Sequence, residues 1–527
     1  MLDIKLLLAS LCLGVGAVVM PPKGPSTITV AGQSPAGAGV PLEAFVSYSI
    51  EFSSFPDFAG NSSSPNTFSN NLLNNIGNLT GTKPYIRVGG NTQDYALFNA
   101  SLETATFGII NPNRSSDYPT TLSIGPSYFD SYSTWPDTKF IHGFNLGKNG
   151  TAARQSLLAT VPLVCRALEN GKLAYWELGN EPDLYKTSAQ GPVRPATWNE
   201  QTYVAQWLNG TRAIRAAMQE PCPDLTTNAL YKYIAPSFAG TGGNNLDPIV
   251  TWEDGLDVDK DIALISSHNY IGGATQPGVT LQGTLMNHTS TVVSISHQLN
   301  ESRLLAALPD SIEPNLPFIL GETNSLYNEG APGLSNSFGA ALWGVDFNLW
   351  IRVMAAYRHR PRRQRHLSPY YGNIAVAAFL GDLTSTVPRI ANLPLPNEEE
   401  AAYAAYVNDT LARIVVINMQ EYNSSTQTNN YTDDYPRPVE RYSFQLPQGC
   451  SGKATTQRLL ANGSDAITGI TFDGYSYNYE LDNGMPVLLN NVTRGETVSV
   501  DRRGRMSVDV PRSSAVIVRL ECEAGCK

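Results

Sequence analysis

Two short segments of the chain share one arrangement, an apolar run that ends in a glutamate. The first segment is Trp-Glu-Leu-Gly-Asn-Glu-Pro at residues 176–182, and the second is Ile-Leu-Gly-Glu-Thr-Asn at residues 319–324. Each apolar run is typical of a buried strand in a parallel sheet, with Glu181 or Glu322 at its C-terminal end. In a (β/α)8 barrel the C-terminal ends of all eight strands surround one site. The arrangement therefore predicts a barrel in which these two carboxylates face each other.

The first 375 residues carry eight such candidate strands. They are apolar or β-branched runs that end in polar residues, at 44–50, 84–88, 139–144, 172–178, 233–236, 262–267, 317–320 and 350–354. Helical patterns lie between them, at 69–76, 152–170, 199–218, 291–307 and 335–350. This alternation predicts a (β/α)8 TIM barrel over residues 44–375, with Glu181 after the fourth strand and Glu322 after the seventh.

The pattern changes in the last third of the chain. Short alternating runs separated by Gly, Asn and Pro recur at 403–418, 440–446, 454–460, 497–500 and 515–520. Such runs predict a C-terminal antiparallel β-sandwich over residues 376–527. A further strand-like run lies within residues 26–43, ahead of the barrel, and we expect it to join the β-sandwich.

The N-terminal segment and the overall charge indicate where this chain works. Residues 1–17 resemble a signal peptide, because Lys5 precedes an apolar core that is too short to cross a membrane. Many Asn-X-Ser/Thr sequons follow, and together these features predict a secreted, extracellular glycoprotein. The net charge of −10 and the pI near 5.2 argue against nucleic acid or an anionic membrane as a partner.

The cysteines predict disulfide bonds rather than a metal site. Cys12 lies within the signal peptide, and the remaining cysteines form no Cys-X-X-Cys motif and no Cys/His ligand spacing. One or two disulfides are expected in an oxidising compartment. Within the C-terminal region, Cys450 can pair with Cys522 or with Cys526.

Two facing carboxylates suit the hydrolysis of glycosidic bonds. One carboxylic acid protonates the leaving oxygen, while the other group, as a carboxylate, meets the positive charge that develops on the sugar. This chemistry requires no metal and no cofactor, and we expect neither.

Several motifs resemble clan A of the retaining glycoside hydrolases. They are Tyr-Ile-Arg-Val-Gly-Gly-Asn at 85–91, Asn-Glu-Pro at 180–182, His-Asn-Tyr at 268–270 and Gly-Glu at 321–322. The longer strings Ser-Ile-Glu-Phe at 49–52, Arg-Val-Gly-Gly-Asn-Thr at 87–92 and Glu-Thr-Asn-Ser at 322–325 are similar to family 79 in particular. That family contains fungal-type secreted β-glucuronidases and heparanase.

The resemblance implies a role for each carboxylate and for its neighbours. Glu181 is expected to act as the acid/base and Glu322 as the nucleophile. Arg87 and Tyr270 are expected to hydrogen-bond the nucleophile, and Asn180 is expected to bind the 2-hydroxyl of the sugar.

Further residues are expected to bind the substrate. Asn91 and Asp94 follow the second strand, where polar side chains can reach distal hydroxyls of the sugar. Tyr327 resembles a family tyrosine that helps to hold the glucuronate carboxylate, and His268 lies at the end of the sixth strand. The expected partner is an oligosaccharide or polysaccharide that bears β-linked glucuronic acid.

The sequence departs from the family around the expected eighth strand. Residues 350–357 run directly into the basic stretch 358–366, where the family carries a loop with His and Tyr that completes the carboxylate pocket. Three explanations compete: a patch that binds anions, a solvated surface loop, and an error in the translated gene model. The third explanation accounts for both the missing family residues and the unusual composition.

The sequence therefore predicts a secreted retaining exo-β-glucuronidase that releases terminal glucuronic or 4-O-methylglucuronic acid from glycans. Two alternatives remain open. One is an endo-β-glucuronidase of the heparanase type, which needs an open cleft. The other is a barrel that binds carbohydrate but is catalytically impaired, which the interrupted eighth strand favours.

Overall fold

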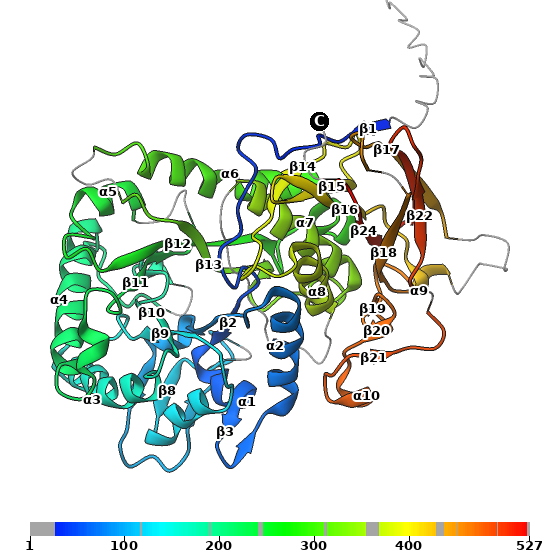
Figure 1. Ribbon diagram of the computed structural model, residues 1–527. Coiled ribbons are helices and arrows are strands. Elements are labelled where there is room, and N and C mark those ends of the chain that lie inside the picture. The colour runs from blue at the N-terminus through cyan, green and yellow to red at the C-terminus, as the bar shows by residue number, and fades with distance from the viewer. Residues whose placement is uncertain are drawn as a thin grey trace, which may run out of the picture.

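The computed structural model describes residues 27–523, apart from 116–117, 189–190, 241–245, 310–313, 355–367, 428–436, 451 and 493. The expected signal peptide, the basic stretch and Cys526 lie outside the described residues. Figure 1 shows two parts side by side, a barrel of strands and helices and a domain made mainly of strands. Within the described residues, no helix is long and apolar enough to span a membrane.

Seven parallel strands form the barrel. In spatial order they are β2 (Tyr48–Glu51), β5 (Ile86–Gly89), β9 (Phe140–Phe144), β10 (Leu173–Leu178), β11 (Tyr233–Phe238), β12 (Ile262–Gly273) and β13 (Phe318–Tyr327). All neighbouring pairs are parallel, and chain order equals spatial order, as expected of a TIM barrel. The sequence analysis therefore located the first seven strands correctly.

The prediction of an eighth strand at residues 350–354 is wrong. These residues form the last turns of helix α7 (Phe338–Met354), and the next described element is helix α8 (Ser368–Leu380). No strand lies between β13 and β2 in the part of the chain that the structure describes. The seven parallel strands nevertheless form a nearly closed TIM barrel.

Helices cover the outside of the barrel (Figure 1). They include α2 (Thr67–Thr80), α3 (Thr151–Ala167), α4 (Glu200–Met218), α5 (Pro248–Glu253) and α6 (His288–Leu305). Helix α4 begins with a capping box, in which the Asn199 side chain accepts from the Thr202 amide and the Thr202 side chain accepts from the Asn199 amide. A disulfide between Cys165 and Cys222 links α3 to the segment after α4.

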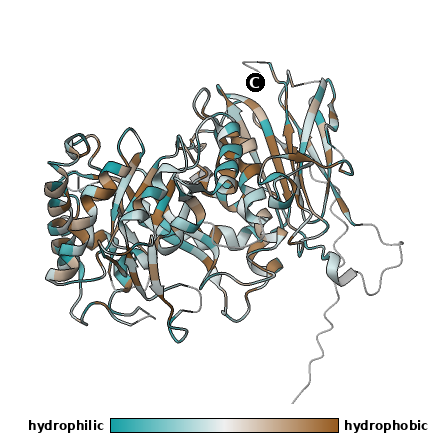
Figure 2. Cartoon of the chain, turned by 90° about the horizontal axis from the view of Figure 1, so that it is seen from below, coloured by the Kyte–Doolittle hydropathy of each residue, from teal (hydrophilic) through white to brown (hydrophobic). Residues whose placement is uncertain are grey.

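The second domain is a sheet that folds over on itself. Its main strands are β14 (Arg389–Asn392), β15 (Glu400–Val407), β16 (Thr410–Asn418), β17 (Val439–Gln445), β18 (Gly452–Leu460), β22 (Thr497–Val500), β23 (Arg505–Pro511) and β24 (Ser514–Arg519). Apolar side chains of β17 and β23 share one buried cluster with those of β15, β16 and β24, so two layers face each other as in a β-sandwich. In Figure 2, hydrophobic residues run along these strands.

One further strand and one disulfide complete this β-sandwich. Strand β1 (Thr27–Thr29) lies beside β17 in parallel, whereas the neighbouring strand pairs of the domain are antiparallel. Cys450 is bonded to Cys522, which confirms one of the two pairings expected in this region. The segment that precedes the barrel in sequence thus belongs to the β-sandwich in space.

The barrel and the β-sandwich share a polar contact inside their apolar junction. The Asp346 carboxylate on α7 is fully buried and accepts from the Tyr403 hydroxyl of β15 at 2.7 Å. His288 Nδ1, at the start of α6, lies 2.9 Å from the same carboxylate. Burial lowers the pKa of His288, but the hydrogen bond and negative charge of Asp346 outweigh this effect and raise the pKa above 6.5.

This contact predicts a pH-dependent contribution to stability. Protonated His288 stabilises the fold fully below about pH 6.5, and the contribution is lost as the pH rises through the raised pKa. His288→Asn should therefore lower the melting temperature by about 2 °C or more near pH 5.5, and by less near pH 9. The exposed His297→Asn on the same helix serves as the control. A deficit of equal size at both pH values would contradict the assignment.

Candidate active site

The site lies where the C-terminal ends of the barrel strands meet. Strand β5 contributes Arg87, and the end of β10 contributes Glu177 and, just beyond it, Glu181. Strands β12 and β13 are longer than the sequence predicted. His268 and Glu322 therefore lie within these strands and are neighbours in the register of the sheet. Neighbouring parallel strands therefore bring together side chains that are far apart in sequence.

Two glycines leave the space that the site requires. A Cβ atom on Gly89 would lie 2.8 Å from Arg87 Nε and 2.7 Å from Gln93 Oε1. A Cβ atom on Gly321, beside Glu322, would lie 2.2 Å from Ser266 Oγ. Any larger residue at either position would displace the side chains that define the site.

The backbone at Glu181 is in the left-handed region, with φ of 50° and ψ of 51°. This conformation is unfavourable for a non-glycine residue, so the surrounding structure must hold it. The Glu181 amide donates to the Ser237 carbonyl at 3.0 Å. The turn after β10 is thus fixed by β11, and it orients the Glu181 carboxylate.

Arg87 is the centre of the polar contacts at the site, and its side chain is only 2% exposed. Its Nε donates to Glu177 Oε2 at 2.8 Å, and its Nη1 donates to Glu322 Oε2 at 2.9 Å. Nη1 also donates to Ser49 Oγ at 3.1 Å, and Nη2 donates to Asn180 Oδ1 at 2.8 Å. One guanidinium therefore links β2, β5, β10 and β13.

The two predicted catalytic carboxylates lie close together. An oxygen of Glu181, an oxygen of Glu322 and a nitrogen of His268 all lie within 4.8 Å of one another. Tyr270 donates a hydrogen bond to Glu322 Oε1, and His268 Nδ1 lies 2.9 Å from Glu181 Oε1. Carboxyl groups about 5–5.5 Å apart are typical of retaining glycosidases, and about 6.5–9.5 Å of inverting ones. The spacing fits the retaining class.

The same three side chains could offer ligand atoms to a metal ion. The Arg87 guanidinium, however, already supplies a positive charge 2.9 Å from Glu322. A cation bound between the carboxylates would be repelled by this charge. The arrangement suits proton transfer and nucleophilic attack better than metal binding.

Asp94 lies beneath the site and is 4% exposed. Its Oδ1 accepts from the amides of Leu146 and Gly147, and its Oδ2 accepts from the Asn180 amide and the Tyr185 hydroxyl. Burial raises the pKa of Asp94 to about 6, although these four hydrogen bonds favour the ionised form. With both oxygens occupied, Asp94 holds the Asn180 backbone in place rather than presenting a free group to a sugar.

Asn91 and Asn180 are joined at the cavity wall. Asn180 Nδ2 donates to Asn91 Oδ1 at 2.9 Å, and Asn91 Nδ2 donates to the Tyr118 hydroxyl at 3.1 Å. Since Asn180 Oδ1 accepts from Arg87, the Asn180 side chain has a fixed orientation. The Asn91 and Asn180 amides therefore lie in one polar wall together with Tyr118.

A cavity of about 870 Å³ opens over these residues. Its walls include both carboxylates, Tyr270 and Tyr327, and the Tyr327 ring meets the Tyr270 ring edge-on, with centroids 6.3 Å apart. Arg114 is the one lysine or arginine among the described residues that line the cavity. Ser115, its neighbour, donates to Glu329 Oε1 at 3.3 Å, so the connection between β7 (Thr106–Ile109) and β8 (Thr121–Ile124) reaches the loop after β13.

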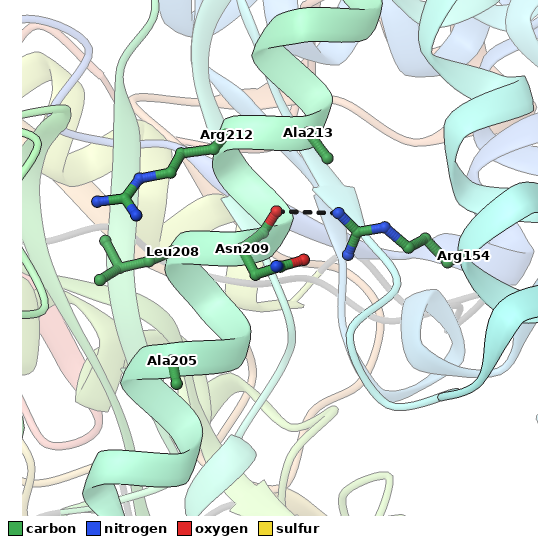
Figure 3. Close-up of a pocket in the computed structure, with 6 residues that line it drawn as sticks. All are labelled: Arg154, Ala205, Leu208, Asn209, Arg212 and Ala213. Carbon is green, nitrogen blue, oxygen red and sulfur yellow. Dashed lines mark hydrogen bonds between the residues drawn. The ribbon is translucent and has the colours of Figure 1, made fainter.

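A second hollow lies on the outer surface of the barrel, between α3 and α4 (Figure 3). Arg154 donates to the Asn209 carbonyl there at 3.1 Å, and Arg212 forms an ion pair with Asp259. None of the described residues that line this hollow carries a carboxylate. It cannot provide the paired acids that glycoside hydrolysis requires.

The structure brings all nine predicted site residues to one end of the barrel. Arg87, Asn180, His268, Tyr270, Glu181 and Glu322 form one connected group, and Asn91, Asp94 and Tyr327 line the cavity beside it. The sequence analysis missed Glu177 and Arg114. Glu177 lies two residues before Gly179 on a predicted strand, so its charge inside an apolar run was an available signal. Arg114 lies in a long loop, for which sequence offers no such signal.

The chain is similar to known proteins along most of its length. The family described as "Glycosyl hydrolase family 79 C-terminal beta domain" matches residues 402–517. A β-glucuronidase of Aspergillus niger is 56% identical over 519 residues, which cover 94% of each chain. A β-glucuronidase of Neurospora crassa is 51% identical over 527 residues, which cover 90% of this chain and 94% of the relative.

Solved structures share the fold. A 4-O-α-L-rhamnosyl-β-D-glucuronidase from Fusarium oxysporum superposes with a TM-score of 0.73 and 24% identity, covering 94% of this chain and all of that one. A family 51 α-L-arabinofuranosidase from Thermotoga petrophila superposes with a TM-score of 0.58 and 11% identity, covering 94% of this chain and 99% of that one. Together with the long, highly identical relatives, these findings show that the chain belongs to glycoside hydrolase family 79.

Proposed function

We propose that this protein is a retaining exo-β-glucuronidase that releases terminal glucuronic or 4-O-methylglucuronic acid from glycans. One observation carries the proposal. Two carboxylates lie within 4.8 Å of each other at the strand ends, and one of them accepts from both Arg87 and Tyr270. The β-glucuronidases of Aspergillus niger and Neurospora crassa support the glucuronidase activity.

The first half of the reaction uses the two carboxylates differently. Glu322 is held as an anion by Arg87 and Tyr270, so it is the group that attacks the anomeric carbon. Glu181 donates a proton to the departing glycosidic oxygen, which leaves with its aglycone as an alcohol. The bond from the anomeric carbon to the aglycone breaks, and an ester bond to Glu322 forms.

The second half reverses these roles. Glu181, now ionised, takes a proton from a water molecule, and the water oxygen attacks the anomeric carbon. The ester bond to Glu322 breaks, and the sugar leaves with its original β configuration. His268, 2.9 Å from Glu181, is placed to orient this carboxylate in both steps.

Selectivity for a uronic acid requires a donor for the sugar carboxylate. The cavity walls carry Asp94, Glu322 and Glu329, and this negative surface repels an anion unless a cation compensates. Arg114 is exposed, lines the cavity and can supply that charge, and the Tyr327 hydroxyl can supply a further hydrogen bond. These two residues are our candidates for binding the glucuronate carboxylate.

Two hydrogen bonds at the cavity rim favour exo action over endo action. The Ser115–Glu329 and Asn91–Tyr118 hydrogen bonds tie the loop that carries Arg114 to both sides of the site. An endo-acting enzyme needs a groove that is open at both ends, through which a polysaccharide can pass. The tied loop favours a pocket that receives one chain end.

Secretion remains part of this proposal. Its support is the N-terminal apolar segment, the sequons and the two disulfides, which persist in oxidising compartments.

Replacing either carboxylate tests the assignment of roles. Glu322→Gln should reduce kcat on an aryl β-glucuronide by about a thousandfold or more, because the nucleophile is lost. Glu181→Gln should retain more activity on substrates with good leaving groups, because these need little protonation. Glu220→Gln, at an exposed position two residues after the end of α4, is the matched control and should behave like wild type.

Azide separates the two roles further. Added azide should restore turnover in both variants. The Glu322 variant should form an α-glucuronyl azide and the Glu181 variant a β-glucuronyl azide, and NMR distinguishes the two products. Azide products of the opposite configuration would reverse the assignment, and near wild-type turnover by Glu322→Gln would refute the site.

Replacing the cavity arginine tests the uronate specificity. Arg114→Gln should lower kcat/KM on an aryl β-glucuronide by about tenfold or more, because a charge-assisted hydrogen bond is lost. Activity on the matching neutral β-glucoside should not fall. Arg154→Gln, in the outer hollow of Figure 3, removes an equally exposed arginine and should change neither value. An equal loss of kcat/KM on both substrates would show that Arg114 does not recognise the glucuronate carboxylate.

A further inference from the structure

Glu177 is a third carboxylate of the site, and it does not line the cavity. It is 1% exposed and lies on β10, four residues before Glu181. Its Oε2 accepts from Arg87 Nε at 2.8 Å and lies 2.7 Å from Arg87 Nη2. Its Oε1 accepts from Ser237 Oγ at 2.6 Å. Glu177 is not among the described residues that line the cavity, so it can affect catalysis only through its partners, Arg87 and Ser237.

The single positive charge of Arg87 is shared between two carboxylates. The guanidinium lies between two carboxylates, with Glu177 on one side and Glu322 at 2.9 Å on the other. If Arg87 faced Glu322 alone, its full positive charge would stabilise the Glu322 anion and reduce the readiness of that anion to attack. Glu177 offsets part of this charge, because opposite charges in a buried site interact strongly.

We propose that Glu177 is a positioning residue that fixes the Arg87 guanidinium and offsets its charge, so that Glu322 is held in place while remaining a reactive nucleophile. This inference rests on the proposed function, since it assigns Glu322 the role of nucleophile. Glu177 contacts Arg87 on β5 and Ser237 on β11.

Among the described residues, groups that face Glu322 come from three other strands. They are Arg87 on β5, Glu181 after β10, and Tyr270 and His268 on β12, with His268 Nδ1 at 3.9 Å from Glu322 Oε2. Of these groups, Arg87 is the one whose charge Glu177 offsets directly. Changing Glu177 therefore alters the charge at Glu322 while the groups that touch Glu322 stay the same.

Glu177→Gln removes the charge and can keep every hydrogen bond. The amide oxygen can accept from Arg87, and the amide nitrogen can donate to Ser237 Oγ, which can in turn donate to Ser266 Oγ at 2.9 Å. The readout is the pH dependence of kcat/KM on an aryl β-glucuronide, whose acidic limb reports the ionisation of Glu322. This limb should move to lower pH by about one unit, because Arg87 then stabilises the Glu322 anion more strongly.

In the same variant, kcat should change much more than KM. We expect kcat to fall about tenfold at the pH optimum, because a better stabilised nucleophile attacks more slowly. KM should change little, because Glu177 does not contact the cavity. Glu177→Asp, which keeps the charge farther from Arg87, should give an acidic limb between those of wild type and Glu177→Gln, and it remains a test if the Gln variant does not fold.

Ser237→Ala is the matched control, because it can alter the position of the Glu177 side chain without removing its charge. It removes the hydrogen bond to Oε1 but keeps the Glu177 carboxylate, so activity should fall at all pH values and the acidic limb should stay in place. A Glu177→Gln profile that falls equally at every pH, or matches wild type, would overturn the inference. Wild-type protein inactive on β-glucuronides would instead refute the proposed function.

Discussion

The site depends on one buried cation. Arg87 is almost inaccessible to solvent, and removing a guanidinium from water costs several kcal/mol unless partners compensate for the lost hydration. Glu177, Glu322, Asn180 and Ser49 provide that compensation. Because these partners come from different strands, the barrel must be assembled before Arg87 can be buried. The same ion pairs that make the burial tolerable also hold the nucleophile in place.

The surrounding structure is arranged around this cation. Gly89 keeps space for the guanidinium, and Asp94 holds the Asn180 backbone through a direct hydrogen bond. Ser237 both supports Glu177 and accepts from the Glu181 amide, so β11 positions two carboxylates at once. The family 79 β-sandwich packs against the barrel through α7 and α8. Asp346 of α7 hydrogen-bonds Tyr403 of the β-sandwich and His288 of α6, and these polar contacts lie within an otherwise apolar junction.

Much of this arrangement could be predicted from the sequence, because local patterns encode strands and strand ends. The first seven strands and the site residues at their ends follow from apolar runs and polar termini. The helical conformation of residues 350–354 could not be predicted in this way. Helix α7 is buried on nearly all sides between the barrel and the β-sandwich, so its sequence has no polar face and resembles a buried strand. The Arg87–Glu177 and Ser115–Glu329 contacts join residues distant in sequence, and only the fold reveals them.

The central claim is that the Arg87-centred contacts make Glu322 the nucleophile of a retaining reaction. Its most direct test is covalent trapping with a 2-deoxy-2-fluoro-β-glucuronyl fluoride, followed by proteolysis and mass spectrometry of the labelled peptide. The account predicts one sugar attached per protein molecule, on the Glu322 side chain. A label on Glu181 or on another residue, or no label on an enzyme that hydrolyses β-glucuronides, would contradict it.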